Sequence, residues 1–143
     1  MAALVDTNIL VYRFDHRFPA KQRISNEVLR RGIENDDVRV PHQAVLEFFA
    51  AVTRPMSRRG PLLTLTDARR ETEELLKQFV IIYPNEDIVR TAILGQAAYQ
   101  LSWFDAHIWA YANHYGLEEI ISEDFEHDRL YGAVRAVNPF LSR

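Results

Sequence analysis

Leu4-Val5-Asp6-Thr7-Asn8-Ile9-Leu10 places an acid directly after a short apolar run near the start of the chain. The run that ends in this acid, residues 2–6, has the length and composition of a buried β-strand. An acid at the end of a buried strand needs a partner, because desolvating an unpaired charge is costly and shifts its pKa strongly. The stretch therefore predicts the first strand of a sheet and a candidate site at its carboxyl end.

Short apolar runs alternate with helical patterns along the rest of the chain. Further strands are predicted at residues 38–41, 79–83, 119–122 and 134–137, and helices at 21–34, 43–54, 66–78, 85–99 and 102–116, with Asn85 and Ser102 as caps and Gly116 at the last end. This alternation is typical of the α/β class, in which helices cover both faces of a mostly parallel sheet. Ligands bind beyond the carboxyl ends of such strands. Asp6 and Asp124 each follow a predicted strand, so both are expected at one rim.

Composition narrows the class of protein further. The 143 residues suggest one domain, residues 1–143, and a net charge of −3 excludes a protein that holds nucleic acid by bulk positive charge. The absence of cysteine excludes disulfides and thiolate zinc sites. Neither a signal peptide nor a membrane-spanning stretch is visible, so a cytoplasmic protein is expected. Local basic positions that could follow a phosphate backbone are Arg13, Arg54, Arg58 and Arg59.

Three further acids interrupt apolar stretches: Glu47, Asp105 and Asp124. Glu47 lies on the alanine-rich side of a helix that is apolar almost all round, which favours a site residue over a salt bridge to an arginine. Asp105 has capping-box spacing from Ser102, and Asp6 could itself cap a short helix. Each of these acids could therefore have a structural role, as a helix cap or in a salt bridge, instead of a role in a functional site.

The last acid is the least certain of the four. Asp124 lies in the acidic turn Ser122-Glu123-Asp124-Phe125-Glu126-His127-Asp128, where Glu123 and Asp128 compete with it as ligands. If the four acids converge, their oxygen atoms suit a hard cation such as Mg²⁺ or Mn²⁺. Thr7 and Asn8 would then orient Asp6 or a bound water.

These motifs together resemble the PIN-domain family, and within it the VapC-type ribonuclease toxins of toxin–antitoxin pairs. The resemblance covers nearly the whole chain. It rests on the opening stretch at residues 5–10, Glu47 in the helix after the second strand, Leu101-Ser102-Trp103-Phe104-Asp105-Ala106, Ile121-Ser122-Glu123-Asp124-Phe125, and the ending at residues 137–140.

The resemblance implies a three-layer sandwich around a five-stranded, mostly parallel sheet. It also implies a catalytic set of Asp6, Glu47, Asp105 and Asp124. The metal would be held by Asp6, Asp105 and Asp124, with Glu47 and Asp128 as possible further ligands.

The expected activity is Mg²⁺- or Mn²⁺-dependent hydrolysis of RNA phosphodiester bonds. The expected partners are a VapB-type antitoxin, a second copy of the chain, and operator DNA only through the antitoxin. Ile24, Val28, Phe48 and Val52 could form part of an apolar groove for the antitoxin, but core packing is the favoured explanation of these four side chains. Two alternatives remain: a PIN-like nuclease in RNA processing or on DNA, and a catalytically weak PIN fold that acts as a binding or regulatory partner.

Overall fold

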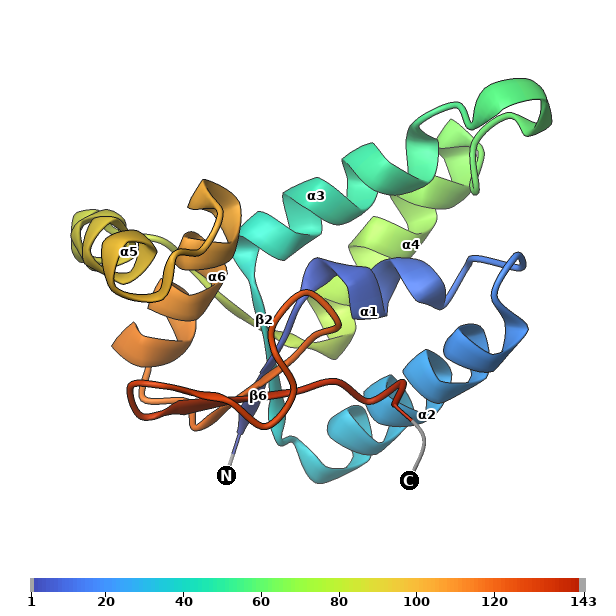
Figure 1. Ribbon diagram of the computed structural model, residues 1–143. Coiled ribbons are helices and arrows are strands. Elements are labelled where there is room, and N and C mark those ends of the chain that lie inside the picture. The colour runs from blue at the N-terminus through green and yellow to red at the C-terminus, as the bar shows by residue number, and fades with distance from the viewer. Residues whose placement is uncertain (1, 142–143) are drawn as a thin grey trace.

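A central six-stranded sheet organises the chain in the computed structural model, which describes residues 2–141. The strand order is β3-β2-β1-β4-β6-β5, and all neighbouring pairs are parallel except β5 with β6. Figure 1 shows helices on either side of the strands. The strands are β1 (Ala3–Val5), β2 (Val38–Pro41), β3 (Val80–Ile82), β4 (Glu119–Ile121), β5 (Leu130–Tyr131) and β6 (Val134–Val137). The predicted α/β class with a mostly parallel sheet is confirmed.

Helices connect these strands and form the outer layers. They are α1 (Thr7–Tyr12), α2 (Pro19–Asn35), α3 (His42–Thr53), the 3₁₀ turn η1 (Ser57–Arg59), α4 (Leu65–Gln78), α5 (Glu86–Tyr99) and α6 (Trp103–His114). Side chains cap three of them as predicted: Asp6 accepts from the amide of Thr7, Asn85 from that of Ile88, and Ser102 from that of Asp105. None of the helices in the described part of the chain is long and apolar enough to cross a membrane.

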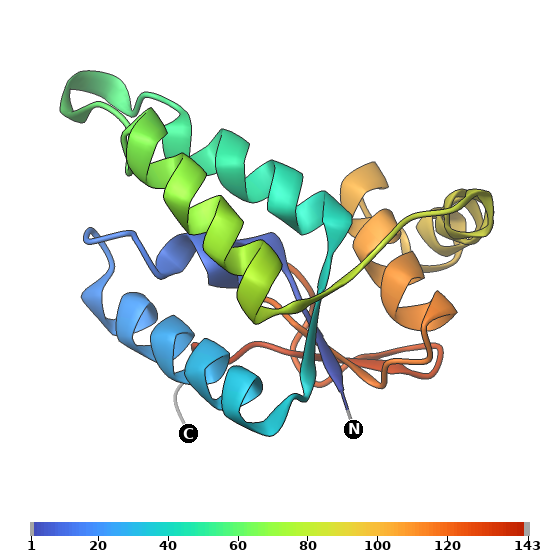
Figure 2. The ribbon, with the colours of Figure 1, turned by 180° about the vertical axis from the view of Figure 1, so that it is seen from behind.

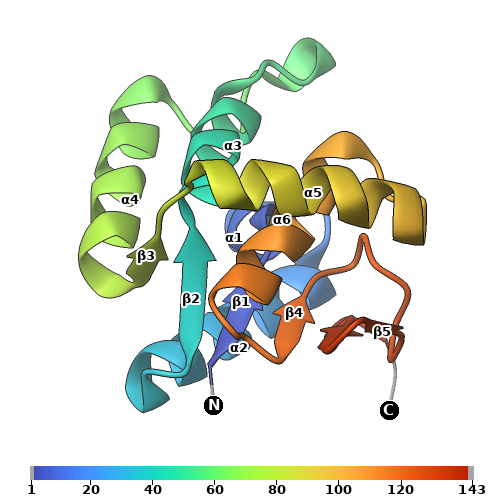
Figure 3. The same ribbon diagram turned by 90° about the vertical axis from the view of Figure 1, so that its left-hand side faces the viewer.

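The side chains of successive strand residues point to opposite faces of the sheet and pack into two separate hydrophobic cores. Leu4, Ile120 and Ala136 pack against α6, with α5 outside it. Val5 and Val40 belong to the other core, which contains side chains of α1, α2, α3 and α4. Figure 3 shows α6 in front of β1 and β4 with α2 behind them, so helices cover both faces. The three-layer arrangement follows from this alternation of strand side chains.

The number of strands differs from the expected five. Leu130 and Tyr131 pair antiparallel with Arg135 and Val134 to add a sixth strand at the edge of the sheet. The turn between them contains Gly132 at a φ of 65°, a conformation that glycine adopts without steric cost. A two-residue strand is too short to show a periodic pattern, which explains why the sequence did not indicate it.

The pairing of β1 with β4 positions the site. Val5 lies opposite Ile121, and the amide of Asp6 donates to the carbonyl of Ile121 at 3.1 Å. The residues that follow these two central strands therefore meet at one rim, as expected of parallel strands.

Candidate metal centre

Asp6 occupies the point where β1 ends and α1 begins. Only 3% of its surface is exposed, although it is a charged residue in the middle of the molecule. One carboxylate oxygen, Oδ1, accepts the amide of Thr7 at 2.7 Å, and the other, Oδ2, accepts the hydroxyl of Ser122 at 2.7 Å. These neutral donors fix the orientation of the carboxylate without neutralising its charge.

Asp105 and Asp124 bring two further carboxylates to Asp6. One oxygen of each of the three acids lies within 4.8 Å of the other two. Asp105 lies in the first turn of α6, and Asp124 lies in the turn that follows β4. Asp105 is half-buried and Asp124 is exposed, so the group opens to solvent on one side. Three acids that are widely separated in the sequence thus converge at the carboxyl edge of the sheet.

The electrostatics of this group favour a positive partner. Burial raises the pKa of Asp6 to about 7, and the negative charges of Asp124 and Asp105 add to that effect. Burial likewise raises the pKa of Asp105, with contributions from Asp124 and Glu47. Within residues 2–141, none of the three acids forms an ion pair with a basic side chain.

Glu47 flanks the three acids from α3. Its carboxylate accepts the hydroxyl of Thr7 at 3.2 Å and the side-chain amide of Gln43 at 2.6 Å. The same amide of Gln43 reaches the carbonyl of Phe104 at 3.3 Å, which links α3 to the start of α6 beside Asp105. The arginine salt bridge considered for Glu47 is absent from the described residues, where its partners are neutral.

Asn8 joins the two ends of the site. Its side-chain amide lies 3.5 Å from Asp6 Oδ2, 3.2 Å from Asp124 Oδ2 and 3.0 Å from the hydroxyl of Ser122. Ser122 is fully buried, and its hydroxyl also accepts the amide of Asp124 at 3.0 Å. Sequence reasoning named Thr7, Asn8 and Ser102 as supporting residues but missed Ser122 and Gln43. The register of β1 against β4, which places Ser122 beside Asp6, is the signal that identifies the serine.

The two competing acids of the last turn point elsewhere. Both carboxylate oxygens of Glu123 are occupied by Tyr12 and Lys21. The carboxylate of Asp128 lies 3.4 Å from the ring of His127, and neither Glu123 nor Asp128 belongs to the converging group. The geometry therefore favours Asp124 as the acid of this turn that joins Asp6 and Asp105.

Three of the four arginines named from the sequence, Arg54, Arg58 and Arg59, lie at the end of α3 or in η1, away from the acids. Arg58 and Arg59 lie in η1, at the tip of the paired helices α3 and α4, whereas the start of α3 adjoins α6 (Figure 2). Arg54 ends α3 on the same side as η1 and is exposed. Arg13 is half-buried after α1, and burial lowers its pKa. Only a substrate that extends along α3 would contact the distant arginines.

The residues present fit a hard divalent cation. Carboxylate oxygens are the ligands that Mg²⁺ and Mn²⁺ prefer, and three of them converge here with neutral hydrogen-bond donors behind them. Such a cation would supply the charge that the described side chains do not. Asp6, Asp105 and Asp124 would hold it, with Glu47 at the side.

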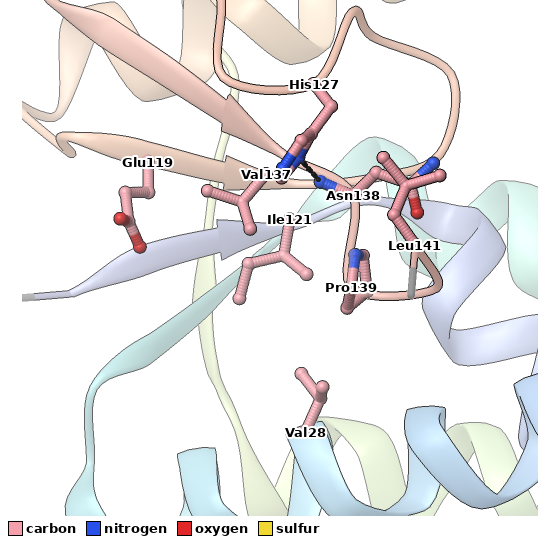
Figure 4. Close-up of a pocket in the computed structure, with 8 residues that line it drawn as sticks. All are labelled: Val28, Glu119, Ile121, His127, Val137, Asn138, Pro139 and Leu141. Carbon is pink, nitrogen blue, oxygen red and sulfur yellow. Dashed lines mark hydrogen bonds between the residues drawn. The ribbon is translucent and has the colours of Figure 1, made fainter. Parts of the chain in front are cut away.

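A separate hollow of about 330 Å³ lies between α2 and the strands β4 and β6. Figure 4 shows Ile121 and Val137 above it and Val28 of α2 below. None of the four acids lines it. A neighbouring groove of about 680 Å³ runs between α2 and residues 139–141 and contains Ile24 and Val28. Phe48 and Val52 are fully buried in the core, as the favoured core-packing interpretation predicted, and they open to neither hollow.

Comparison with known proteins agrees with this architecture. The PIN-domain family model matches residues 3–133, which is most of the chain, so the chain belongs to the PIN-domain family. A search of curated proteins found no match.

Two solved structures have a similar fold. One is a toxin–antitoxin complex from Klebsiella pneumoniae, with a TM-score of 0.68 and 24% identity over 96% of this chain and 98% of that chain. The other is VapC20 of Mycobacterium tuberculosis, described as a sarcin–ricin loop cleaving toxin. Its TM-score is 0.59, with 15% identity over 94% of this chain and 99% of that chain.

Proposed function

We propose that this chain is a divalent-metal-dependent endoribonuclease that acts as the toxin of a toxin–antitoxin pair. The observation that carries the proposal is the convergence of Asp6, Asp105 and Asp124 at one rim without a basic partner among the described residues. The PIN-domain match supports nuclease chemistry, and the two similar structures support the toxin role.

The site divides into ligands and a base. Asp6, Asp105 and Asp124 would hold Mg²⁺ or Mn²⁺. When bound, such an ion supplies positive charge that attracts the RNA phosphate and stabilises the charge that develops during displacement. Glu47 lies outside the converging group and is oriented by Thr7 and Gln43, so it is free to take the proton of the attacking water. Ser122 and Asn8 hold Asp6 and Asp124 in register.

Cleavage of RNA by the purified protein tests the activity. Structured RNA is incubated with wild type in Mg²⁺ or Mn²⁺, in excess EDTA, and with Asp105→Asn. We expect cleavage by wild type with metal, and none by wild type in EDTA or by Asp105→Asn. Asp36→Asn is the matched control, because Asp36 is an exposed acid in a left-handed conformation that asparagine tolerates, and its ion pair to Arg39 lies outside the site. Equal cleavage by wild type and Asp105→Asn, or none under any condition, would refute the proposal.

Induced expression separates the toxin from the alternatives. Wild type is expected to arrest growth, whereas Asp6→Asn and Asp105→Asn are not. Cleavage of RNA or DNA in vitro without growth arrest would favour a processing nuclease. Activity in neither assay would favour a binding or regulatory PIN fold.

The proposed partners are an antitoxin and a second copy of the chain. An antitoxin arginine would satisfy the three unneutralised acids, and operator DNA would be reached only through that antitoxin. Exposed apolar side chains support a homodimer: they lie on α3 (Leu46), α5 (Val89, Ile93 and Leu94) and at the start of α6 (Trp103 and Phe104). Chemistry on RNA and the absence of a spanning helix among the described residues are consistent with the cytoplasm as the place of action.

A further inference from the structure

Glu123 precedes Asp124 in the chain but faces a different cluster. Its Oε1 accepts the ammonium of Lys21 at 2.7 Å, and its Oε2 accepts the hydroxyl of Tyr12. The ammonium of Lys21 also donates to the Tyr12 hydroxyl at 3.3 Å. Each of the three polar groups therefore contacts the other two, and both oxygens of Glu123 are directed into this cluster and not toward the three converging acids.

Three aromatic rings lie beside the Lys21 ammonium, whose side chain is 35% exposed. It lies 4.9 Å from the ring centroid of Tyr12, 5.6 Å from that of Phe18 and 5.4 Å from that of Phe140. Tyr12 packs edge-on against both phenylalanines, at 5.7 and 5.2 Å. Cation–π attraction adds to the ion pair with Glu123, and the three rings restrict the lysine side chain, which is otherwise flexible. An ordinary surface salt bridge lacks such neighbouring rings.

The turn after β4 is held at each of its first three residues. Ser122 donates to Asp6, Glu123 is held by Tyr12 and Lys21, and Asp124 accepts from Asn8. The backbone amide of Asp124 donates to the Ser122 hydroxyl at 3.0 Å, whereas its carboxylate accepts the amide of Asn8, which is shared among three acceptors. Because the carboxylate has this one shared donor among the described residues, the anchoring of the neighbouring Glu123 contributes to its position.

We propose that Tyr12, Lys21 and Glu123 are positioning residues for the metal centre. The Lys21–Glu123 pair holds the turn that carries Asp124 beside Asp6 and Asp105, and it directs the Glu123 carboxylate away from the ion that these three acids would hold. The inference rests on the proposed function, since it assigns a role to residues next to the proposed ligands. Lys21 reaches this site from α2, 102 positions before Glu123, which is why the spacing of the acids did not reveal it.

Mn²⁺ binding by the full chain, measured by calorimetry, tests this role. Residues that orient metal ligands change metal affinity by about 10- to 100-fold when they are replaced. We expect Lys21→Met to weaken Mn²⁺ binding by about tenfold and Lys21→Arg to restore most of it. Lys77→Met is the matched control, because Lys77 is an exposed lysine whose contact to Glu74 is 3.9 Å long and remote from the acids. Thermal unfolding of each variant shows that it is folded.

Two further measurements separate positioning from other roles. Lys21→Met combined with Glu123→Gln should bind Mn²⁺ no more weakly than Lys21→Met alone, because the pair acts as a unit. The Mn²⁺ concentration for half-maximal cleavage should rise while the KM for RNA stays unchanged. A rise in the KM for RNA with unchanged Mn²⁺ affinity would overturn the inference and make Lys21 a phosphate contact. Equal Mn²⁺ affinity of wild type and Lys21→Met would also overturn it, whereas no Mn²⁺ binding by wild type would refute the proposed function itself.

Discussion

Replacing Asp6 by asparagine is expected to stabilise the metal-free protein while it destroys the metal centre. Burial raises the pKa of Asp6 from its ordinary value of 3.8 to about 7 in the folded chain. The folded protein therefore binds this proton more tightly than the unfolded chain does. By linkage, the contribution of Asp6 to stability falls as the pH rises from about 4 to about 7 and is level above that.

The size of this effect follows from the same two values. At about 1.4 kcal/mol for each pKa unit, the interval from 3.8 to about 7 corresponds to about 4 kcal/mol of lost stability at pH 8. The asparagine side chain would carry no charge and could still accept the amide of Thr7. The substitution is then expected to raise the melting temperature at pH 8 by about 10 °C and to change it little near pH 4.

Calorimetric unfolding at several pH values, with and without metal, measures both halves of the prediction. In saturating Mn²⁺ the wild type should gain about 3 kcal/mol at 100 times Kd, and Asp6→Asn should gain nothing. The Asp36→Asn control should behave as wild type in both conditions. Two outcomes would contradict a raised pKa of Asp6. One is a lower melting temperature of Asp6→Asn than of wild type at pH 8 in EDTA, and the other is a difference in melting temperature that does not vary with pH.

Three other predictions concern the scaffold and the exposed surface. Gly95→Ala should lower the free energy of unfolding by about 1–3 kcal/mol in denaturant, because a Cβ at this position would overlap the Trp109 ring. The loss should be smaller in a Trp109→Phe background, and an unchanged stability of Gly95→Ala would contradict this packing. Hydrogen bonds from Arg17 lower the pKa of Asp15, so Asp15→Asn should lose stability at pH 7 but less as the pH falls below 4; a pH-independent loss would contradict this. Leu94→Glu, at a side chain that is 71% exposed, should convert a dimer to a monomer in light scattering without lowering the melting temperature of the monomer, and an unchanged mass would remove α5 from the interface.

Much of the scaffold follows from periodicity and end signals in the sequence. The strand at Val38–Pro41 and the strand at Val134–Val137 have the predicted bounds, and the caps at Asn85 and Ser102 are confirmed. The last helix runs to His114 with Tyr115 as its C-cap, and Gly116, at a φ of 68°, ends it as predicted. These features could be predicted because each depends on the residue types of a short stretch of chain.

The site could be predicted only in part. Asp6, Glu47, Asp105 and Asp124 stood out because acids in apolar segments are anomalous, and their convergence could be anticipated for the two that follow strands. Ser122 and Lys21 carry no such anomaly, since a serine after a strand and a lysine on a helix are ordinary. Their roles depend on strand register and on contacts across more than 100 residues, which no local pattern encodes.

The pairing of β1 with β4 has a consequence for the order in which the molecule becomes chemically competent. Asp6 is synthesised 116 residues before Ser122, and the two residues meet only when β1 and β4 pair. Contacts of such high sequence separation form late, because the closure of a long loop must precede them. A chain interrupted before β4 lacks one of the three converging acids and the hydroxyl that orients another. The three acids can therefore converge only after the chain has been made through β4 and the turn that follows it.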